Sequence, residues 1–223
     1  MKISVIIPTW NAASALPLTL AALGTVAEVI VADGGSVDET AGIGAAAGAI
    51  VTRAKQGRGG QLAAGIAEAG QDWLLLLHAD TILAAAWRDD AAAHMRDHPD
   101  RAAYFRFALD SADPRARHLE RAVAWRCRVL ALPYGDQGLL IHRRVLAAIG
   151  GMRALPLMED VDLVSRLGRA RLAGLAARAV TSAAKWEREG WYRRSARNLC
   201  CLTAWRLGVS PERIARFYTT GPN

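Results

Sequence analysis

Three short polar clusters, each directly after an apolar run, are the first candidates for chemistry in this sequence. They are Pro8–Asn11 (PTWN), Ala32–Ser36 (ADGGS) and His78–Asp80 (HAD). The apolar runs before them read as β-strands, and the ligands of an open parallel sheet bind beyond the carboxyl ends of its strands. We therefore expect the three clusters to converge on one edge of a sheet and to form a ligand site there.

Two further segments carry side chains suited to a reaction on a phosphorylated molecule. Lys55–Gly65 (KQGRGGQLAAG) puts cations and flexible backbone near a predicted helix start, where phosphate binds well; a solvated basic loop is the alternative. The segment MEDVDL supplies Glu159, Asp160 and Asp162 at another predicted helix start. A carboxylate there could act as a general base, but negative charge also favours the helix dipole, so capping alone explains one or two of the three.

Several common catalytic motifs are absent from the sequence. No G-x-G-x-x-G follows the first apolar run, and there is no Walker sequence, G-x-S-x-G elbow or H-E-x-x-H. These absences argue against four classes of protein: dinucleotide oxidoreductases, P-loop enzymes, serine hydrolases of the elbow type and zinc proteases. Without a glycine-rich first turn, backbone amides cannot approach a pyrophosphate closely, so phosphate charge must be met by a cation and by side chains.

The elements that position these residues follow a rhythm of short apolar runs and alanine-rich amphipathic stretches, which is typical of β-α-β units on a parallel sheet. The runs are continuous rather than alternating, which indicates strands covered on both faces. In the first half we predict strands at 3–8, 28–33, 49–53 and 72–79, and helices at about 14–24, 38–47, 59–70 and 84–97. In the second half we predict a half-exposed strand at 102–110, a helix at about 114–131, a short strand at 137–142, helices from near Glu159 and at about 190–207, and a last helix with Ser210 as its cap and Pro211 in first position.

The composition is that of a globular protein with reduced cysteines. A chain of 223 residues with 52% hydrophobic residues can bury one large core, so we expect a single domain over residues 1–223. Cys127, Cys200 and Cys201 are odd in number and lack C-x-x-C spacing. This pattern indicates neither a disulfide framework nor a structural zinc site.

Charge and hydropathy bear on where the protein acts. No apolar run approaches the roughly 20 residues that cross a bilayer, and the N-terminus lacks a cleavage site, so we expect a cytoplasmic protein without a transmembrane segment. The first 100 residues carry 6 basic and 11 acidic side chains, and the rest carry 22 and 10. The basic half faces an anionic partner, or it reflects gene base composition. The aromatic and basic helix at 190–207 could contact the inner membrane face peripherally, with core packing as the alternative.

Four motifs, SVIIPTWNA, VIVADGGSVDET, LLLLHAD and LMEDVDL, occur in an order that resembles the family-2 glycosyltransferases of the GT-A fold. The segments PYGDQGLLIHRRV and GVSPERIARFY further resemble a small bacterial subgroup found beside radical-SAM genes and linked to arsenosugar biosynthesis. The resemblance implies a Rossmann-like three-layer α/β/α sandwich with a mostly parallel central sheet. It also implies an inverting transfer of a sugar from a nucleoside diphosphate donor, with UDP as the expected nucleotide, assisted by Mn²⁺ or Mg²⁺.

On the donor side, the resemblance gives roles to residues of the polar clusters. Asp33 would recognise the nucleotide base, although a turn-forming aspartate before two glycines is the alternative. Arg58 would bind the diphosphate, and Asp80 would bind the metal ion. The segment Pro8–Trp10 would contact the base, with Pro8, Thr9 and Trp10 as its members and Trp10 as a stacking face, against core packing as the alternative.

His78 departs from the family pattern, because it stands where the first aspartate of the D-x-D motif is expected. Imidazole is a softer ligand than carboxylate and suits Mn²⁺ better than Mg²⁺. Three interpretations remain open: a metal ligand, a hydrogen-bond partner of the ribose or diphosphate, and a buried histidine with satisfied hydrogen bonds.

For the reaction itself, the resemblance selects Asp160 as the general base, with Glu159 as the second candidate. Asp136 and Gln137 follow a Pro-Tyr pair and could form a hydroxyl-binding wall for the acceptor, or only a turn. The segment SAAKW resembles a degenerate Q-x-x-R-W element, with Lys185 near the diphosphate and Trp186 stacked on the acceptor. The departures from that element make processive synthesis unlikely. We expect a small or lipid-linked acceptor.

Two other functions compete with this interpretation. A sugar-phosphate nucleotidyltransferase shares the layered sheet but needs a glycine-rich basic loop after the first strand, which PTWNA is not. A catalytically impaired protein that only binds nucleotide sugars is the second, supported by His78 and by Ala63, where an asparagine is often found. Nucleic acid is not an expected partner, because the arginine-rich half contains no recognisable nucleic-acid-binding module.

Overall fold

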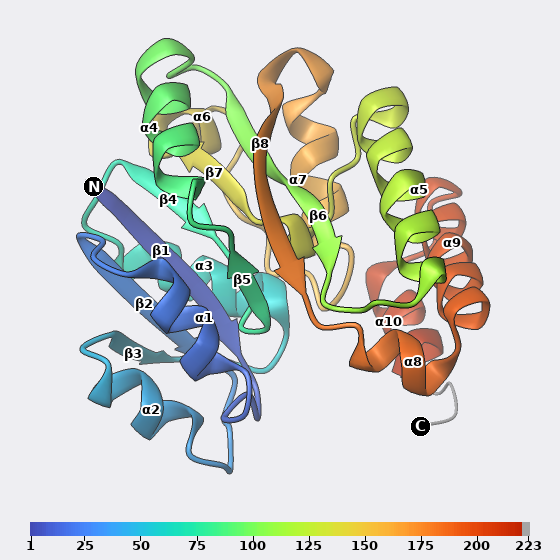
Figure 1. The fold of residues 1–223 in the computed structure, drawn as a ribbon, viewed down its shortest axis with the longest axis horizontal. Coiled ribbons are helices and arrows are strands. Elements are labelled where there is room, and N and C mark those ends of the chain that lie inside the picture. Colours follow the sequence, from blue (N-terminus) through green and yellow to red (C-terminus); the bar gives the residue numbers. More distant parts are fainter. Residues whose placement is uncertain (220–223) are drawn as a thin grey trace.

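The computed structural model describes residues 1–219 and consists of a twisted sheet with helices on both faces, as Figure 1 shows. The strands are β1 (Ile3–Thr9), β2 (Glu28–Asp33), β3 (Ile50–Arg53), β4 (Trp73–Leu76), β5 (Thr81–Leu83), β6 (Ala102–Leu109), β7 (Leu139–His142) and β8 (Leu172–Thr181). The helices are α1 (Leu16–Leu23), α2 (Thr40–Ala46), α3 (Arg58–Glu68), α4 (Trp87–Asp97), α5 (Pro114–Leu130), α6 (Arg143–Ala148), α7 (Glu159–Leu167), α8 (Ala184–Glu189), α9 (Trp191–Arg206) and α10 (Pro211–Thr219), with 3₁₀ turns η1 (Gly135–Gln137) and η2 (Arg169–Arg171).

The strand order within residues 1–219 is β3-β2-β1-β4-β7-β6-β8-β5. The strands β3, β2, β1 and β4 are mutually parallel, β7 runs antiparallel to both β4 and β6, β8 is parallel to β6, and β5 is antiparallel to β8. The sheet is thus mostly parallel, as predicted. The carboxyl ends of β1, β2, β4, β6 and β8 and the amino end of β7 lie along one edge, so the loops there can share a site.

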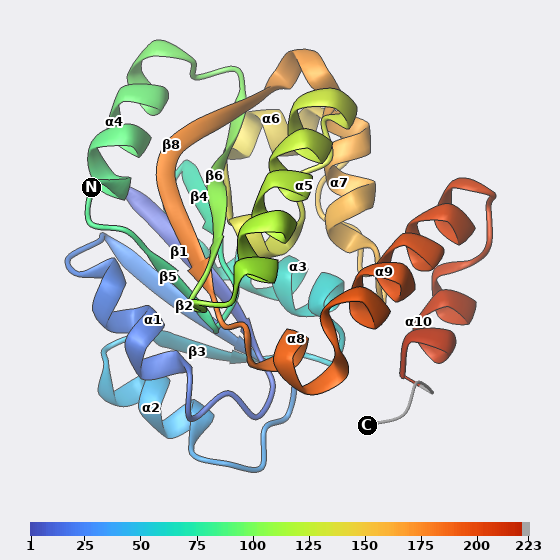
Figure 2. The same ribbon diagram turned by 45° about the vertical axis from the view of Figure 1, so that its right-hand side comes forward.

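Both faces of the sheet are buried, which is why the strand sequences are continuously apolar. Alternate residues of β1 separate onto the two sides: Ile6 packs with Leu62 of α3 and Val161 of α7, while Ile7 packs with Leu16 of α1 and with α4. A third cluster, which includes Phe107, Trp186 and Trp191, joins β6 and α5 to the C-terminal helices. In Figure 2 these helices, α8 to α10, extend beyond the carboxyl ends of β6 and β8.

Several elements differ from the sequence-based prediction. The strand predicted at 72–79 ends at Leu76, so His78 lies in the loop after β4. The strand predicted as half-exposed at 102–110 is β6, and most of it is buried. Strands β5 and β8 and helices α6 and α8 were not predicted. Strand β8 reads LAGLAARAVT and has few β-branched residues, so its strand character comes from pairing with β6 and β5.

Within residues 1–219, no helix is long and apolar enough to cross a membrane. The single domain expected over 1–223 remains a prediction, and its last four residues, 220–223, lie outside the described part of the chain.

Close packing of α3 on β1 requires a glycine at position 65. A Cβ on Gly65 would lie 2.5 Å from Cγ2 of Ile6. Gly65→Ala is therefore expected to lower the free energy of unfolding by about 1–3 kcal/mol through overpacking. Urea denaturation measures this change. Gly60→Ala in the same helix is the matched control, because its Cβ would meet nothing closer than 3.7 Å and alanine favours a helix. Equal stability of the two variants would contradict the packing argument.

Candidate active site

The loops after β1 and β2 are tied together by side chains of the segment GGSVDET. Ser36 Oγ accepts a hydrogen bond from the backbone N–H of Asn11 at 2.8 Å, and Asn11 Oδ1 accepts from the N–H of Val37 at 3.0 Å. Thr40 Oγ1 accepts from the N–H of Ala12 at 2.8 Å. Asn11 has a φ of 48°, a left-handed conformation that asparagine tolerates better than most residues. The polar residues of this motif thus fix the shape of the first loop.

Asp33 is the centre of the second loop. Its carboxylate accepts from Thr9 Oγ1 at 3.1 Å, from the N–H groups of Gly35 and Ser36 at 3.0 and 2.8 Å, and from Ser36 Oγ at 2.5 Å. Burial raises the pKa of Asp33, but these hydrogen bonds outweigh it and the net pKa is lowered. The side chain is 3% exposed and its acceptor positions are filled. This environment favours the turn-forming alternative, in which Asp33 fixes the turn and holds the side chain of Thr9 by a hydrogen bond.

Gln61 of α3 was not selected from the sequence, yet it joins the ends of the first two strands. Its Nε2 donates to the carbonyl groups of Thr9 at 2.6 Å and Ala32 at 2.9 Å, and its Oε1 accepts from the N–H of Gly57 at 3.2 Å. A buried amide that satisfies three backbone groups holds the start of α3 against the sheet edge. From the sequence, Gln61 could be recognised only as a glutamine in a predicted helix, which is a weak indication of this role.

Two adjoining cavities open at this edge of the sheet. The larger, about 410 Å³, lies over the loop after β1 and is lined by Pro8, Thr9 and Trp10, a residue that is 55% exposed. The smaller, about 140 Å³, lies toward the C-terminal helices and is lined by Asp136 and Asp160, among others. The residues shared by both cavities are Arg58, His78, Asp80, Ser182 and Lys185. The exposure of Trp10 rules out core packing for that residue.

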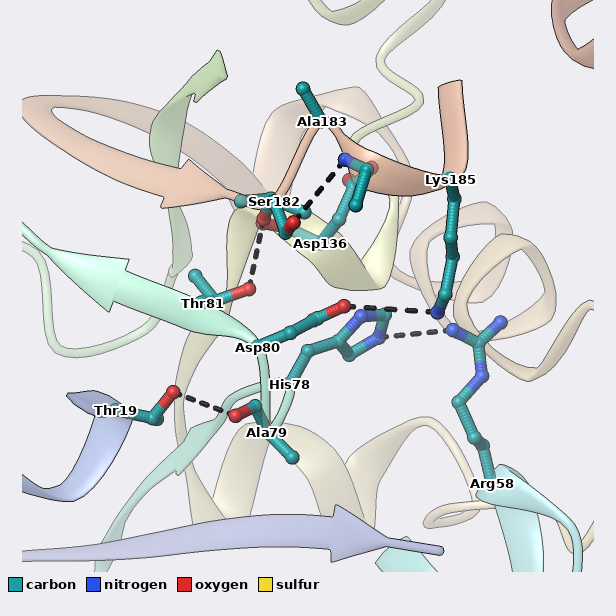
Figure 3. Close-up of polar contacts among 12 residues, drawn as sticks. Thr19, Arg58, His78, Ala79, Asp80, Thr81, Asp136, Ser182, Ala183 and Lys185 are labelled. Carbon is teal, nitrogen blue, oxygen red and sulfur yellow. Dashed lines mark hydrogen bonds and ion pairs between the residues drawn. The ribbon is translucent and has the colours of Figure 1, made fainter. Parts of the chain in front are cut away.

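The wall between the cavities is an array of charged and polar side chains, drawn in Figure 3. Lys185 Nζ lies 3.7 Å from Asp80 Oδ2, and Arg58 Nη1 lies 3.1 Å from His78 Nε2. A guanidinium group can only donate, so Nε2 accepts and the neutral ring carries its proton on Nδ1. Burial lowers the pKa of His78 to about 4, and the charge of Arg58 acts in the same direction. Of the three interpretations of His78, the buried histidine with a satisfied hydrogen bond fits best, because its neutral ring accepts from Arg58.

Glu159 and Asp160 are neighbours in sequence but have different surroundings. Glu159 is 1% exposed, and its Oε1 lies 2.8 Å from Arg58 Nε, so it anchors the guanidinium. Asp160 lines the smaller cavity, and its two oxygens accept from the N–H groups of Gly135 at 2.8 Å and Val161 at 2.7 Å. These backbone donors hold the carboxylate in one orientation. Of the two acids, Asp160 is therefore the one presented to a ligand.

The third acid of that segment, Asp162, has a structural role. It accepts from Arg153 at 2.9 Å and forms an ion pair with Arg166 at 2.6 Å. The residue before the helix, Met158, has a φ of 66°. This strained left-handed conformation for a non-glycine residue turns the chain sharply into α7 at the cavity wall.

Asp136 and Gln137, both expected to contact an acceptor, separate in the structure. Asp136 lines the smaller cavity, and its Oδ1 is buried without a hydrogen-bond partner in the described residues. Gln137 is 2% exposed, donates to the carbonyl of Phe105 at 3.0 Å and accepts from the N–H of Tyr134 at 3.2 Å. Within residues 1–219, Gln137 lines neither the larger nor the smaller cavity. The expected acceptor contact of Gln137 is therefore not supported, and its buried amide instead shapes the turn η1.

The helix start after β8 contributes to the same site. Trp186 lines the smaller cavity while its ring stacks on Trp191 with centroids 6.2 Å apart, and the guanidinium carbon of Arg194 lies 5.0 Å from its centroid. Trp186 is 8% exposed, so much of its surface is already buried by protein. An acceptor in the smaller cavity would meet an edge of Trp186 rather than an open stacking face.

The side chains around Asp80 offer a divalent ion few protein ligands. Mg²⁺ is usually held by one or two carboxylates together with water and substrate phosphates. Here the lone pair of His78 Nε2 is engaged by Arg58, and the carboxylate of Asp80 faces the ammonium group of Lys185. In the described part of the chain, no group of three or more His, Cys, Asp or Glu side chains is placed to hold a metal ion. His78 is therefore not free to act as a metal ligand while it accepts from Arg58, and a divalent ion bound by Asp80 would compete with Lys185 and draw its other ligands from a bound diphosphate.

Comparison with known proteins gives a family match and a set of structural matches. The model of the family described as Glycosyl transferase family 2 matches residues 4–156, more than half of the chain. A sequence search of curated proteins finds no match.

Among solved structures, S. aureus TarS 1-349 superposes with a TM-score of 0.65 at 17% identity, over 82% of this chain and 61% of that chain. Glucosyl-3-phosphoglycerate synthase (GpgS) from Mycobacterium tuberculosis, in complex with Mn²⁺, UDP and glucosyl-3-phosphoglycerate, superposes with a TM-score of 0.55 at 20% identity, over 81% of this chain and 70% of that chain. This chain thus spans about three fifths of the length of the TarS chain. At these identities the likeness establishes the fold.

The buried carboxyl group of Asp136 predicts a pH-dependent stability. Burial raises its pKa to about 6, against the effect of Arg126, and the nearby Asp160 adds to the rise. Between the unfolded pKa and about 6 the folded state binds more protons, so the free energy of unfolding falls as pH rises through this window. Asp136→Asn is expected to flatten this slope and to stabilise the protein at pH 7 by up to about 3 kcal/mol. Urea denaturation at several pH values measures both effects.

The control for this prediction is Asp72→Asn, which changes an exposed aspartate before β4 and should leave the slope intact. An unchanged slope in the Asp136 variant would contradict the assigned cause.

Proposed function

Because the chain belongs to glycosyl transferase family 2, we propose that it transfers one sugar from a nucleoside diphosphate donor to a hydroxyl group of an acceptor. Its fold is that of the GT-A glycosyltransferases, as expected from the sequence. The observation that carries the proposal is the pair of cavities that meet at one wall of cations and carboxylates. Because the two cavities share these lining residues, substrates bound in both would have their reacting ends close together.

The larger cavity is the proposed donor site. Its volume of about 410 Å³ is within the usual range for sites of small molecules and cofactors. The exposed indole of Trp10 offers a flat face to a nucleotide base, and Arg58 and Lys185 lie at the diphosphate end. UDP is the proposed nucleotide; crystal structures of TarS and of GpgS, both similar in fold, contain UDP. Asp33 would serve this site by fixing the loop rather than by touching the base.

The smaller cavity is the proposed acceptor site, and Asp160 is the proposed general base. An acceptor hydroxyl near its carboxylate would lose its proton to Asp160 while its oxygen forms a bond to the anomeric carbon. The bond from that carbon to the diphosphate breaks on the opposite side, which inverts the configuration. A cavity of about 140 Å³ favours a small acceptor, or the reactive end of a lipid-linked one. Glu159 is a positioning residue for Arg58 in this scheme.

Mn²⁺ occurs in the GpgS complex. In the described part of this chain Asp80 is not joined by further His, Cys, Asp or Glu side chains into a metal-binding group, and no step of the proposal uses a divalent ion. The link to arsenosugar biosynthesis and a peripheral contact with the inner membrane face stay predictions.

A donor panel tests the proposal as a whole. The protein is incubated with nucleotide sugars of different base and sugar, and the released nucleoside diphosphate is measured with and without candidate acceptors. We expect release from UDP-sugars. Binding of UDP without turnover of any donor would instead favour a protein that only binds nucleotide sugars, and release of pyrophosphate from a sugar phosphate and UTP would favour a nucleotidyltransferase.

Replacement of the proposed base tests the mechanism. Asp160→Asn removes the proton acceptor and is expected to lower kcat by about 10²–10⁴-fold with little change in UDP affinity. Steady-state kinetics and calorimetry with UDP measure the two quantities. Asp72→Asn is the control and should keep full turnover. A correctly folded Asp160 variant with undiminished turnover would reject Asp160 as the base.

A further inference from the structure

The negative charge of a nucleoside diphosphate must be met at the wall between the cavities. This charge grows during transfer, because the electrons of the broken bond remain on a phosphate oxygen. Within the described residues, the larger cavity is lined by three cationic side chains, Arg58, Lys185 and Arg188, and by one carboxylate, that of Asp80. The charge of the lining is therefore already complementary to a diphosphate, before any ion is added.

Lys185 is the cation best placed to act at this wall. It lines both cavities, and its ammonium nitrogen lies 3.7 Å from Asp80 Oδ2. Figure 3 draws this ion pair as a dashed line. The two side chains are 58% and 27% exposed, so the ion pair is long and weak. An ammonium group has three N–H donors, and Asp80 can engage only part of them. The group is thus held near Asp80 and still able to donate to phosphate oxygens.

Arg58 is the second cation, and two protein side chains fix its orientation. Glu159 holds its Nε at 2.8 Å and His78 accepts from its Nη1 at 3.1 Å. Neither contact uses Nη2. A guanidinium held in this way presents a planar set of donors that matches a phosphate group.

We propose that the ammonium group of Lys185 takes the place of a divalent cation and, with Arg58, neutralises the diphosphate, so that donor binding and transfer need no Mg²⁺ or Mn²⁺. This inference rests on the proposed function. In the transfer step the bond between the anomeric carbon and the diphosphate breaks, and its electron pair stays on the phosphate oxygen beside Lys185. The acceptor oxygen bonds to the anomeric carbon, and its proton goes to Asp160.

His78, which replaces the first aspartate expected in a D-x-D motif, is consistent with this arrangement. A carboxylate in that position would put a second negative charge beside the diphosphate, where it would need a metal ion to offset it. A neutral imidazole adds no charge, and it accepts a hydrogen bond from Arg58 instead. Asp80 then serves to position Lys185.

Calorimetric titration with UDP tests the inference directly. We expect wild-type protein in excess EDTA to bind UDP with a Kd close to that measured with Mn²⁺. Lys185→Ala removes charge-assisted hydrogen bonds and should weaken UDP binding in EDTA roughly ten- to a hundredfold. Lys2→Ala, an exposed lysine at the amino end of β1 and away from the site edge, is the matched control and should leave the Kd unchanged.

Two further variants separate the roles of charge, fold and metal. Lys185→Arg keeps a cation and should recover part of the affinity that the alanine variant loses, which a simple folding defect would not allow. Asp80→Asn removes the carboxylate that a divalent ion would require and leaves Lys185 without its partner. Because the inference gives the metal no part, we expect Mn²⁺ to leave the Kd of UDP unchanged for this variant and for the wild type alike. A strengthening of UDP binding by Mn²⁺ in the wild type that this variant loses would show a metal held by Asp80 and would overturn the inference.

The outcomes are distinguishable from a failure of the proposed function. UDP binding that appears only with Mn²⁺ would overturn this inference and leave the glycosyltransferase proposal standing. Equal binding of UDP by the wild type and Lys185→Ala in EDTA would overturn the assignment of Lys185. If UDP does not bind under either condition, the inference is overturned. Turnover of another donor in the panel would then show that UDP was the wrong nucleotide, and turnover of no donor would overturn the proposed function itself.

Discussion

The ion pair between Glu159 and Arg58 is the interaction on which the rest of the site depends. Glu159 is almost fully buried, while the side chain of Arg58 is 40% exposed, so loss of Glu159 would release the guanidinium from its fixed orientation at the cavities. Arg58 in turn engages His78, and a Cβ on Gly135 would lie 2.6 Å from Nε2 of that ring. The N–H of Gly135 donates to Asp160, the neighbour of Glu159. Residues of α3, η1, α7 and the loop after β4 thus form a closed ring of contacts.

The carboxylates near the site divide into those that hold the protein together and those that face the cavities. Asp33 and Asp162 are saturated by hydrogen bonds or ion pairs from the protein itself. Asp80, Asp136 and Asp160 line the smaller cavity. This division matters for the chemistry because a carboxylate that already accepts all the hydrogen bonds it can hold is a poor base and a poor ligand.

Several arginines of the second half form hydrogen bonds to the protein's own backbone. The guanidinium of Arg143 donates to the carbonyl of Ala69 after α3, that of Arg166 to Ile149 after α6, and that of Arg169 to Arg128 in the last turn of α5. These carbonyls lie near the ends of helices, where the chain lacks intrahelical donors. The charge asymmetry seen in the sequence is thus explained in part without an external anionic partner.

The sequence by itself determined the sheet edge at which the site lies, because continuous apolar runs fix the buried parallel strands and strand direction sends PTWN, ADGGS and HAD to the same edge. It did not reveal strand β8, whose alanine-rich sequence has little strand preference of its own. Consequently, the approach of Lys185 to Asp80, across about a hundred residues of chain, was decided only by tertiary structure. The same holds for Gln61 and Gln137, since whether a polar side chain is satisfied internally depends on groups that are distant in sequence and meet only when the sheet closes.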